Sequence, residues 1–227
     1  MKNRFTVVIP VVNLDLFGKL IKSICENTLL PKRVILIDNS KESFGAIYNH
    51  IPSTNGIIYE VYYSKTGLVN ESLNLGTVNA LEGKSEYVSF LNDDVILNSL
   101  FFERLSKSFE ELNCAAACPK TVNTMDEMIL EPYNPLIMNK REGWALSVRK
   151  DVLEKISLFP SDRVATFHWD DWIWYHTLNM KLYWYKDTGN TIFHKVGASV
   201  AKLGFRSHKR KERNEFQQIA REKGWTA

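Results

Sequence analysis

Several features that define common protein classes are scarce or missing in this sequence. Its 227 residues include only three cysteines, Cys25, Cys114 and Cys118, and no second Cys/His pair follows at zinc-finger spacing. Cysteines this sparse, set within apolar or helical patterns, predict reduced packing residues and argue against a disulfide framework or a zinc site. No apolar run approaches the ~20 residues of a membrane span, and the amino end has too few apolar residues for a signal peptide. We therefore expect a cytoplasmic protein.

Two nucleotide-binding signatures are absent as well. No Gly-x-Gly-x-x-Gly follows the first apolar run, which argues against a Rossmann dinucleotide site, and no Walker sequence occurs. The formal net charge of +3 is too small to indicate nucleic acid as a partner. What is present is an ordinary globular composition, with 44% hydrophobic and 24% charged residues, in a chain long enough to bury one sizeable core.

The first half of the chain alternates short apolar runs with helical patterns. The runs predict strands over 5–10, 33–37, 56–62, 87–91 and 114–118, and the helical patterns predict helices over 15–27, 44–51, 69–81 and 100–112. Strands alternating with helices predict βαβ units with right-handed crossovers. We therefore expect a single Rossmann-like α/β domain with a central, mostly parallel sheet flanked by helices.

The second half is less regular. Residues 120–140 predict a hairpin or flap, 143–149 a strand, 151–156 a short helix, and 182–185 and 191–193 two short strands. These pieces predict a smaller mixed sheet in the C-terminal half. The last stretch is basic and predicts a helix over 213–221.

Polar clusters follow three of the expected parallel strands. They are Pro10-Val11-Val12-Asn13, Asp38-Asn39-Ser40 and Asn92-Asp93-Asp94. In open parallel sheets, ligands bind beyond the carboxyl ends of the strands, so the three clusters predict one pocket. Two adjacent acids at a buried strand end repel each other unless a divalent cation such as Mg²⁺ or Mn²⁺ lies between oxygen ligands. The alternative is a solvated turn after the strand.

Seven short motifs occur in order between about residue 5 and residue 199. They are Pro10-Val11-Val12-Asn13, Asp38-Asn39-Ser40, Gly67 with Asn74-Leu75-Gly76, Asn92-Asp93-Asp94, Gly143 to Arg149-Lys150, Asp170-Asp171, and His194 before Gly197-Ala198-Ser199. Each motif is weak alone, but together they resemble the family 2 glycosyltransferases, whose fold is called GT-A. Asn92 in place of the first Asp of Asp-x-Asp resembles rhamnosyltransferase-like members.

The resemblance implies a domain organisation and an activity. A GT-A domain would cover residues 1–200, with a nucleotide-binding half (1–119) and an acceptor or catalytic half (120–200), followed by a basic tail (201–227). The implied reaction is the metal-dependent, inverting transfer of a sugar from a UDP-, dTDP- or GDP-linked donor. The implied acceptor is a glycan or a lipid-linked saccharide, as in polysaccharide biosynthesis.

The resemblance also implies roles for individual residues. The cation, Mn²⁺ or Mg²⁺, would be held by Asp94 and His194, although His194 could instead cap a strand end. The implied donor-binding residues are Pro10, Val11, Val12, Asn13, Asp38, Asn39, Gly67, Asn74, Asn92 and Asp93.

The implied catalytic base is Asp171, with Asp170 as the second choice. A carboxylate held among Trp169, Trp172 and Trp174 would have its pKa raised by desolvation and could accept the proton of an acceptor hydroxyl. The alternative is that one of the two acids caps a helix. The aromatic cluster could be a platform on which sugars stack or a wall of the core.

Other interpretations remain open. A sugar-phosphate nucleotidyltransferase shares an α/β core, but this chain lacks that class's Gly-rich loop ending in Pro-Lys. A non-catalytic nucleotide-sugar or glycan binder would tolerate the departures at Asn92 and Ile173. The basic tail, with Lys202, Arg206 and the 208–213 run, could cover the donor diphosphate, contact the cytoplasmic face of an anionic membrane, or be a solvated helix face.

Overall fold

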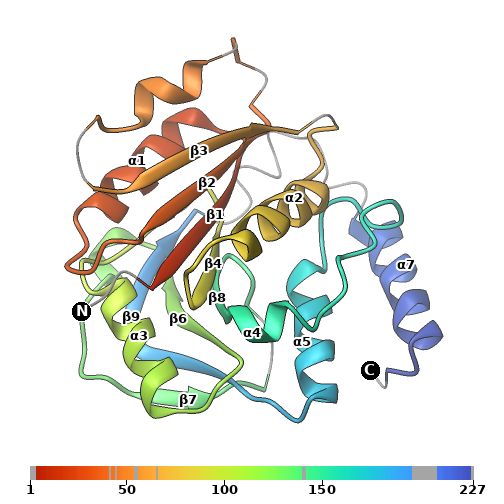
Figure 1. Ribbon diagram of the computed structural model, residues 1–227. Helices are drawn as coiled ribbons and strands as arrows, with labels where there is room; N and C mark the ends of the chain where they lie inside the picture. The colour runs from red at the N-terminus through yellow and green to blue at the C-terminus, as the bar shows by residue number, and fades with distance from the viewer. Residues whose placement is uncertain are drawn as a thin grey trace.

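The computed structural model of the protein describes residues 4–40, 42–43, 45–53, 56–64, 66–139, 142–195 and 209–225. Within these residues the chain forms one nine-stranded sheet with helices on both faces (Figure 1). The strands are β1 Phe5–Val11, β2 Arg33–Asp38, β3 Ile58–Tyr63, β4 Tyr87–Leu91, β5 Val95–Ile96, β6 Ala116–Val122, β7 Pro135–Ile137, β8 Ala145–Arg149 and β9 Trp184–His194. The α-helices are α1 Leu14–Cys25, α2 Val69–Glu82, α3 Phe101–Glu111, α4 Lys150–Leu153, α5 Trp169–Asn179 and α7 Lys209–Glu222. Two 3₁₀ turns cover Ala46–His50 and Met125–Glu127.

The sheet combines a parallel half and a mixed half. Strands β3, β2, β1 and β4 are parallel neighbours, as the βαβ pattern predicted. Strand β8 then pairs antiparallel with both β4 and β6, and β6 runs parallel to β9. The predicted smaller mixed sheet is therefore continuous with the parallel sheet, because β8 hydrogen-bonds to both halves.

The two strands expected over 182–185 and 191–193 are one strand, β9. The polar residues between them did not look like strand, but Asp187 and Asn190 are almost fully buried. Asp187 Oδ1 accepts hydrogen bonds from the backbone N–H groups of Asn134 and Gly189, each at 3.0 Å. The register of the β6–β9 pairing shifts after Pro119, and this irregularity accommodates the polar residues of β9 within one strand.

The core lies in two layers, one on each face of the sheet. Alternate residues of β1 divide between them, with Val7 and Ile9 facing α1 and α3, and Val8 facing α2. Helix α2 comes so close to β1 that a Cβ atom at Gly76 would lie 2.2 Å from Val8 Cγ1. The Gly76 of the Asn-x-Gly motif is thus required by packing.

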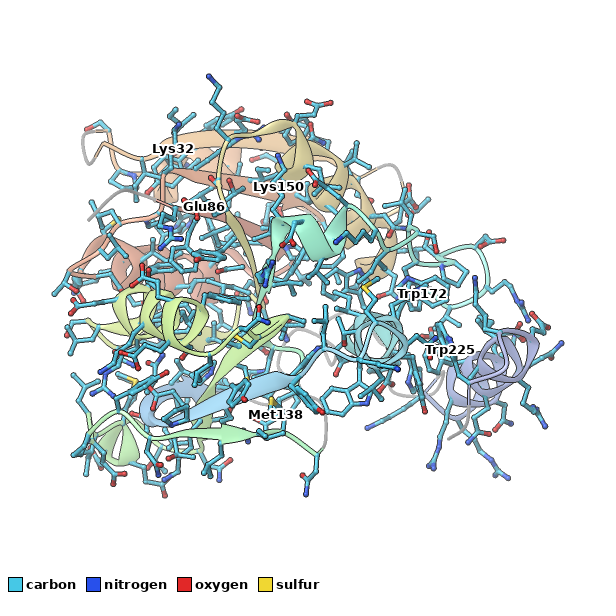
Figure 2. The ribbon with its side chains drawn as sticks, turned by 60° about the horizontal axis from the view of Figure 1, so that its bottom comes forward. Lys32, Glu86, Met138, Lys150, Trp172 and Trp225 are labelled. Carbon is cyan, nitrogen blue, oxygen red and sulfur yellow. The ribbon has the colours of Figure 1, made fainter. Side chains whose placement is uncertain are left out.

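Helix α7, which lies inside the segment predicted as a basic tail, belongs to the second core layer. Phe216, Ile219 and Ala220 are buried there, and α7 lies beside α5 (Figure 1). Figure 2 shows Trp172 of α5 and Trp225 close to each other between these helices, and their ring centroids are 5.2 Å apart. The predicted tail residues Lys202 and Arg206 lie outside the described residues.

Candidate active site

The three predicted polar clusters meet at the carboxyl edge of the parallel strands. The Asn39 N–H donates to the Val11 carbonyl at 2.7 Å, which joins the ends of β1 and β2. Asp93 Oδ2 accepts hydrogen bonds from the Val12 and Asn13 N–H groups, each at 2.7 Å, which joins the ends of β1 and β4. The Asp93 side chain is 2% exposed, and through these two hydrogen bonds it holds the backbone that follows β1.

Asp38 ends β2 at the same edge. Its Oδ1 accepts hydrogen bonds from the Ser40 N–H at 2.8 Å and the Ser40 hydroxyl at 2.6 Å, and the residue is 8% exposed. Burial, together with neighbouring Tyr48 and Asp38, raises the pKa of Tyr63 at the end of β3. An acid and two tyrosines therefore lie together where a nucleobase or ribose would be expected from the sequence.

Asp94 and His194 form a buried pair beside these clusters. The antiparallel pairing of β5 with β9 sets Val95 opposite His194, and the Lys195 N–H donates to the Asp94 carbonyl at 3.0 Å. This register brings His194 Nε2 to 3.2 Å from Asp94 Oδ1. Asp94 is 4% exposed and His194 5% exposed.

The chemistry of this pair fits a divalent cation. Asp94 Oδ1 and both ring nitrogens of His194 are buried, and beyond the 3.2 Å contact of Nε2 with Oδ1 they make no hydrogen bond to the described residues. Buried polar atoms without partners cost free energy, and a cation bound by the carboxylate and the imidazole would remove that cost. No group of three or more His, Cys, Asp and Glu residues in the described part of the chain could hold a metal. Within the part of the chain that the structure describes, the site would thus offer Asp94 and His194 as side-chain ligands.

The two residues just before β8 contact both His194 and Asp170, the first acid of Asp170-Asp171. Trp144, just before β8, stacks on the His194 ring with centroids 5.0 Å apart, and its carbonyl accepts the Asn92 N–H at 2.9 Å. The neighbouring residue, Gly143, lies against Asp170: a Cβ atom at Gly143 would be 2.7 Å from Asp170 Cγ. Asp170 is partly exposed. Its carboxyl group therefore lies next to the residue that precedes Trp144.

Asp171 has a different neighbour, His168. Asp171 is 8% exposed, and its Oδ2 lies 2.5 Å from His168 Nδ1 at the amino end of α5. His168 has φ 69° and ψ 11°, a left-handed conformation that is uncommon for a residue with a side chain. The two acids predicted as base and alternative thus have different surroundings, although they are adjacent in sequence.

The aromatic residues around these acids form a wall of the core. Trp169, Trp172 and Trp174 are 7%, 3% and 8% exposed. Trp169 packs against Phe90 of β4, with ring centroids 4.1 Å apart, and Trp174 packs edge-on against Trp184 of β9. Side chains this buried offer no free face to a sugar, so of the two interpretations of this cluster, the packing role is the correct one for these three residues.

Two predicted donor-binding residues have other surroundings. The Asn74 side chain bonds to the backbone of Phe159, with Nδ2 donating to its carbonyl at 2.8 Å and Oδ1 accepting its N–H at 3.0 Å. Through these two bonds, the Asn74 side chain holds the loop that contains Phe159. Gly67, with φ 69°, lies in the loop between β3 and α2, where its N–H donates to the Ser64 hydroxyl at 3.0 Å.

Sequence reasoning missed two residues that hold the segment before α5. Asn70 is fully buried on α2, and its Nδ2 donates to the carbonyls of Val164 and Phe167, each at 2.9 Å. Glu212, 7% exposed on α7, accepts hydrogen bonds from the backbone of the same segment. In the sequence, Glu212 stands out only as an acid in a basic helix, and that pattern does not indicate which backbone groups it binds.

Comparison with known proteins defines the class. Residues 6–169 match the family described as "Glycosyl transferase family 2". Because this match covers most of the chain, the chain belongs to that family. The matched segment contains the β1, β2 and β4 clusters but ends before Asp170, Asp171 and His194. No curated protein matches the sequence.

Solved structures show the same GT-A fold. A crystal structure of S. aureus TarS residues 1–349 in complex with UDP is similar with a TM-score of 0.63 at 15% identity, covering 84% of this chain and 60% of that one. A crystal structure of GalNAc-T7 with UDP, GalNAc and Mn²⁺ is similar with a TM-score of 0.68 at 11% identity, covering 84% of this chain and 42% of that one. The chain thus spans about 60% or less of the length of these two structures.

Among the described residues, none of the helices is both long and apolar enough to cross a membrane.

Proposed function

We propose that this chain is the catalytic domain of a metal-dependent, inverting glycosyltransferase. The donor would be a nucleotide-sugar, and the acceptor a glycan or a lipid-linked saccharide. The single observation that carries the proposal is the buried Asp94–His194 pair, 3.2 Å apart, beside the joined carboxyl ends of β1, β2 and β4. The UDP in the TarS structure, and the UDP and Mn²⁺ in the GalNAc-T7 structure, support UDP and Mn²⁺ as the first ligands to test.

Asp94 and His194 are proposed to hold the cation, Mn²⁺ or Mg²⁺. When bound, such an ion supplies Lewis-acid stabilisation of the negative charge on a departing diphosphate. An imidazole ligand suits Mn²⁺ better than Mg²⁺, which prefers oxygen. Asp38 and the backbone of Val11 and Val12 are proposed to bind the nucleoside, and Asp93 is proposed to keep that backbone in place.

The acceptor hydroxyl must lose its proton as it attacks the sugar, and a carboxylate at the start of α5 is proposed to accept it. We retain Asp171 as the proposed base, because its carboxylate is held in one orientation by His168. Asp170 is the alternative, and its position against Gly143 beside Trp144 favours it. Direct displacement needs no covalent intermediate, and one carboxylate is sufficient.

Titration with nucleotides tests the cation site. We expect UDP to bind with Mn²⁺ and to bind at least 10-fold more weakly without it, and dTDP and GDP serve as competitors that identify the nucleoside. Asp94→Ala and His194→Ala should each remove the Mn²⁺ dependence. Binding of glycans without any nucleotide effect would instead indicate a carbohydrate-binding protein.

Turnover tests the transferase activity itself. Release of nucleoside diphosphate from a panel of UDP-, dTDP- and GDP-sugars is expected for one nucleotide class. Release of a sugar 1-phosphate and a nucleoside triphosphate, when diphosphate is added, would indicate a nucleotidyltransferase. Asp171→Asn should lower turnover by a factor of about 10² to 10⁴ with UDP binding unchanged. The same loss in Asp170→Asn, with Asp171→Asn fully active, would assign the base to Asp170.

Membrane contact through the basic C-terminal segment remains a proposal. The first turns of α7 carry four exposed cations, Lys209, Arg210, Lys211 and Arg213. A cluster of cations attracts anionic lipids at low ionic strength. Co-sedimentation with vesicles containing phosphatidylserine, but not with neutral vesicles, would support this contact, and equal recovery with both would exclude it.

A further inference from the structure

The segment just before α5 is held from both sides by residues of other helices. On the α2 side, Asn70 binds the carbonyls of Val164 and Phe167 through its side chain, and its N–H donates to the Ala165 carbonyl at 2.9 Å. On the α7 side, Glu212 Oε2 accepts hydrogen bonds from the N–H groups of Thr166 and Phe167, each at 3.0 Å. Hydrogen bonds to a carboxylate are stronger than those between neutral groups. The backbone that leads into His168 is therefore fixed.

Helix α7 also orients the His168 ring. The imidazole stacks on Phe216 of α7, with ring centroids 4.9 Å apart and planes 12° apart. In this orientation His168 Nδ1 lies 2.5 Å from Asp171 Oδ2. The left-handed backbone of His168 is what allows a residue three positions before Asp171 to direct its ring at that carboxylate.

The contact has a chemical consequence for Asp171. A carboxylate on the first turn of a helix can rotate about two side-chain bonds, and most of its orientations do not point at a substrate. When Nδ1–H of His168 donates to Oδ2, the carboxylate is held in the orientation set by that contact. Misplacement of a reacting group by about 1 Å can lower a rate by roughly 100-fold.

We infer that His168 is a positioning residue for the proposed base Asp171, and that Glu212 and Phe216 of α7 keep His168 in place. The inference rests on the proposed function. It gives α7 a role in turnover, although α7 contributes no group to the reaction. It also separates two of the three glutamates of α7: Glu212 binds the segment before His168, whereas Glu215 pairs with Arg163 at 2.7 Å, where both side chains are about one-third exposed.

The test uses substitutions that respect the backbone of His168. Glycine tolerates φ 69° and removes the ring, so His168→Gly should fold. Asparagine also tolerates this conformation, and its Nδ2 occupies nearly the position of His Nδ1, so His168→Asn can restore the hydrogen bond. Glu212→Gln and Glu215→Gln form a matched pair on α7, of which only the first alters the bonds to Thr166 and Phe167.

The readouts are kcat and KM for the nucleotide-sugar that the wild type turns over, and the dissociation constant of UDP with Mn²⁺. We expect His168→Gly to lower kcat by about 10- to 100-fold with an unchanged KM and UDP affinity. His168→Asn should recover at least half of that loss on a logarithmic scale. Glu212→Gln should lower kcat by a smaller factor, and Glu215→Gln should leave it unchanged.

A double-mutant cycle on the urea unfolding of His168→Gly, Asp171→Asn and the double variant checks the contact without any activity assay. Measurable coupling supports the contact, and additive effects overturn the inference. A kcat within twofold of wild type in His168→Gly, or an Asn variant no better than Gly, also overturns it. If the wild type binds UDP with Mn²⁺, shows the coupling and turns over no nucleotide-sugar, the proposed function fails, and the role in turnover fails with it.

Discussion

The adjacent acids Asp93 and Asp94 should respond differently to the same isosteric substitution, the first in stability and the second in ligand binding. Asp93 Oδ2 accepts two backbone N–H groups at 2.7 Å in a site that is 2% exposed. Hydrogen bonds to a charged group contribute roughly 1.5–3 kcal/mol and neutral ones roughly 0.5–1.5, so Asp93→Asn should cost about 2 kcal/mol. For a protein of this size that corresponds to a decrease of about 4–8 °C in Tm.

Asp94 has no such bonds to lose at its buried oxygen. Asp94 Oδ1 accepts no hydrogen bond from the described residues, and its near neighbour is His194. Because burying a charged oxygen that accepts no hydrogen bond costs free energy, and asparagine removes the charge while keeping the shape, Asp94→Asn should change the free energy of unfolding by less than about 1 kcal/mol in the absence of metal.

Urea unfolding followed by tryptophan fluorescence measures both effects, with and without UDP and Mn²⁺. A ligand at 100 times its dissociation constant stabilises a protein by about 2.7 kcal/mol, and we expect this gain in the wild type and its loss in Asp94→Asn. A loss of under about 0.5 kcal/mol in Asp93→Asn would contradict the assigned hydrogen bonds. Full stabilisation of Asp94→Asn by UDP and Mn²⁺ would contradict the cation site.

Three further predictions concern packing and pH. Burial lowers the pKa of His176 between α5 and α7, so the folded protein resists its protonation. Stability should therefore be constant above the ordinary value of about 6.5 and decrease as the pH falls below it, and His176→Gln should reduce this decrease in Tm measured from pH 8 to 5. Gly76→Ala would place a methyl group 2.2 Å from Val8 Cγ1, so calorimetry should show a loss of about 1–3 kcal/mol; unchanged stability would contradict the close packing. Gly143→Ala should displace the Asp170 carboxylate, so kcat should stay near that of the wild type if Asp171 is the base; a large loss of kcat with unchanged UDP affinity in a separate titration would assign the base to Asp170.

The nucleotide-binding half was largely predictable because its strands follow local rules. Short β-branched runs ending in polar residues gave β1, β2 and β4 to within a residue or two, and parallel pairing then required their carboxyl ends to meet. The hydrogen bond from Asn39 to Val11 is the direct result. The proximity of Asp94 and His194 came from the motif resemblance alone, since 99 intervening residues separate them in sequence.

The C-terminal half was less predictable because its elements depend on distant partners. Asp187 and Asn190 are strand residues only because buried partners satisfy their polar groups. The polar pattern of α7 left a donor cover, a membrane contact and a solvated helix face open, whereas in the structure apolar side chains such as Phe216 are buried and Glu212 binds the backbone before α5. Helical periodicity cannot identify which distant backbone a glutamate will bind.

The sequence by itself determined the alternation of strands and helices, and with it the edge where the polar clusters gather, because residue periodicity and chain direction are local properties. Only the tertiary structure decided what each acid does. Asp93 holds backbone, Asp94 lies against His194, and Asp170 and Asp171 face different neighbours. Adjacent residues with the same side chain differ in this way because a carboxylate's role depends on the donors that surround it, and those donors come from distant parts of the chain.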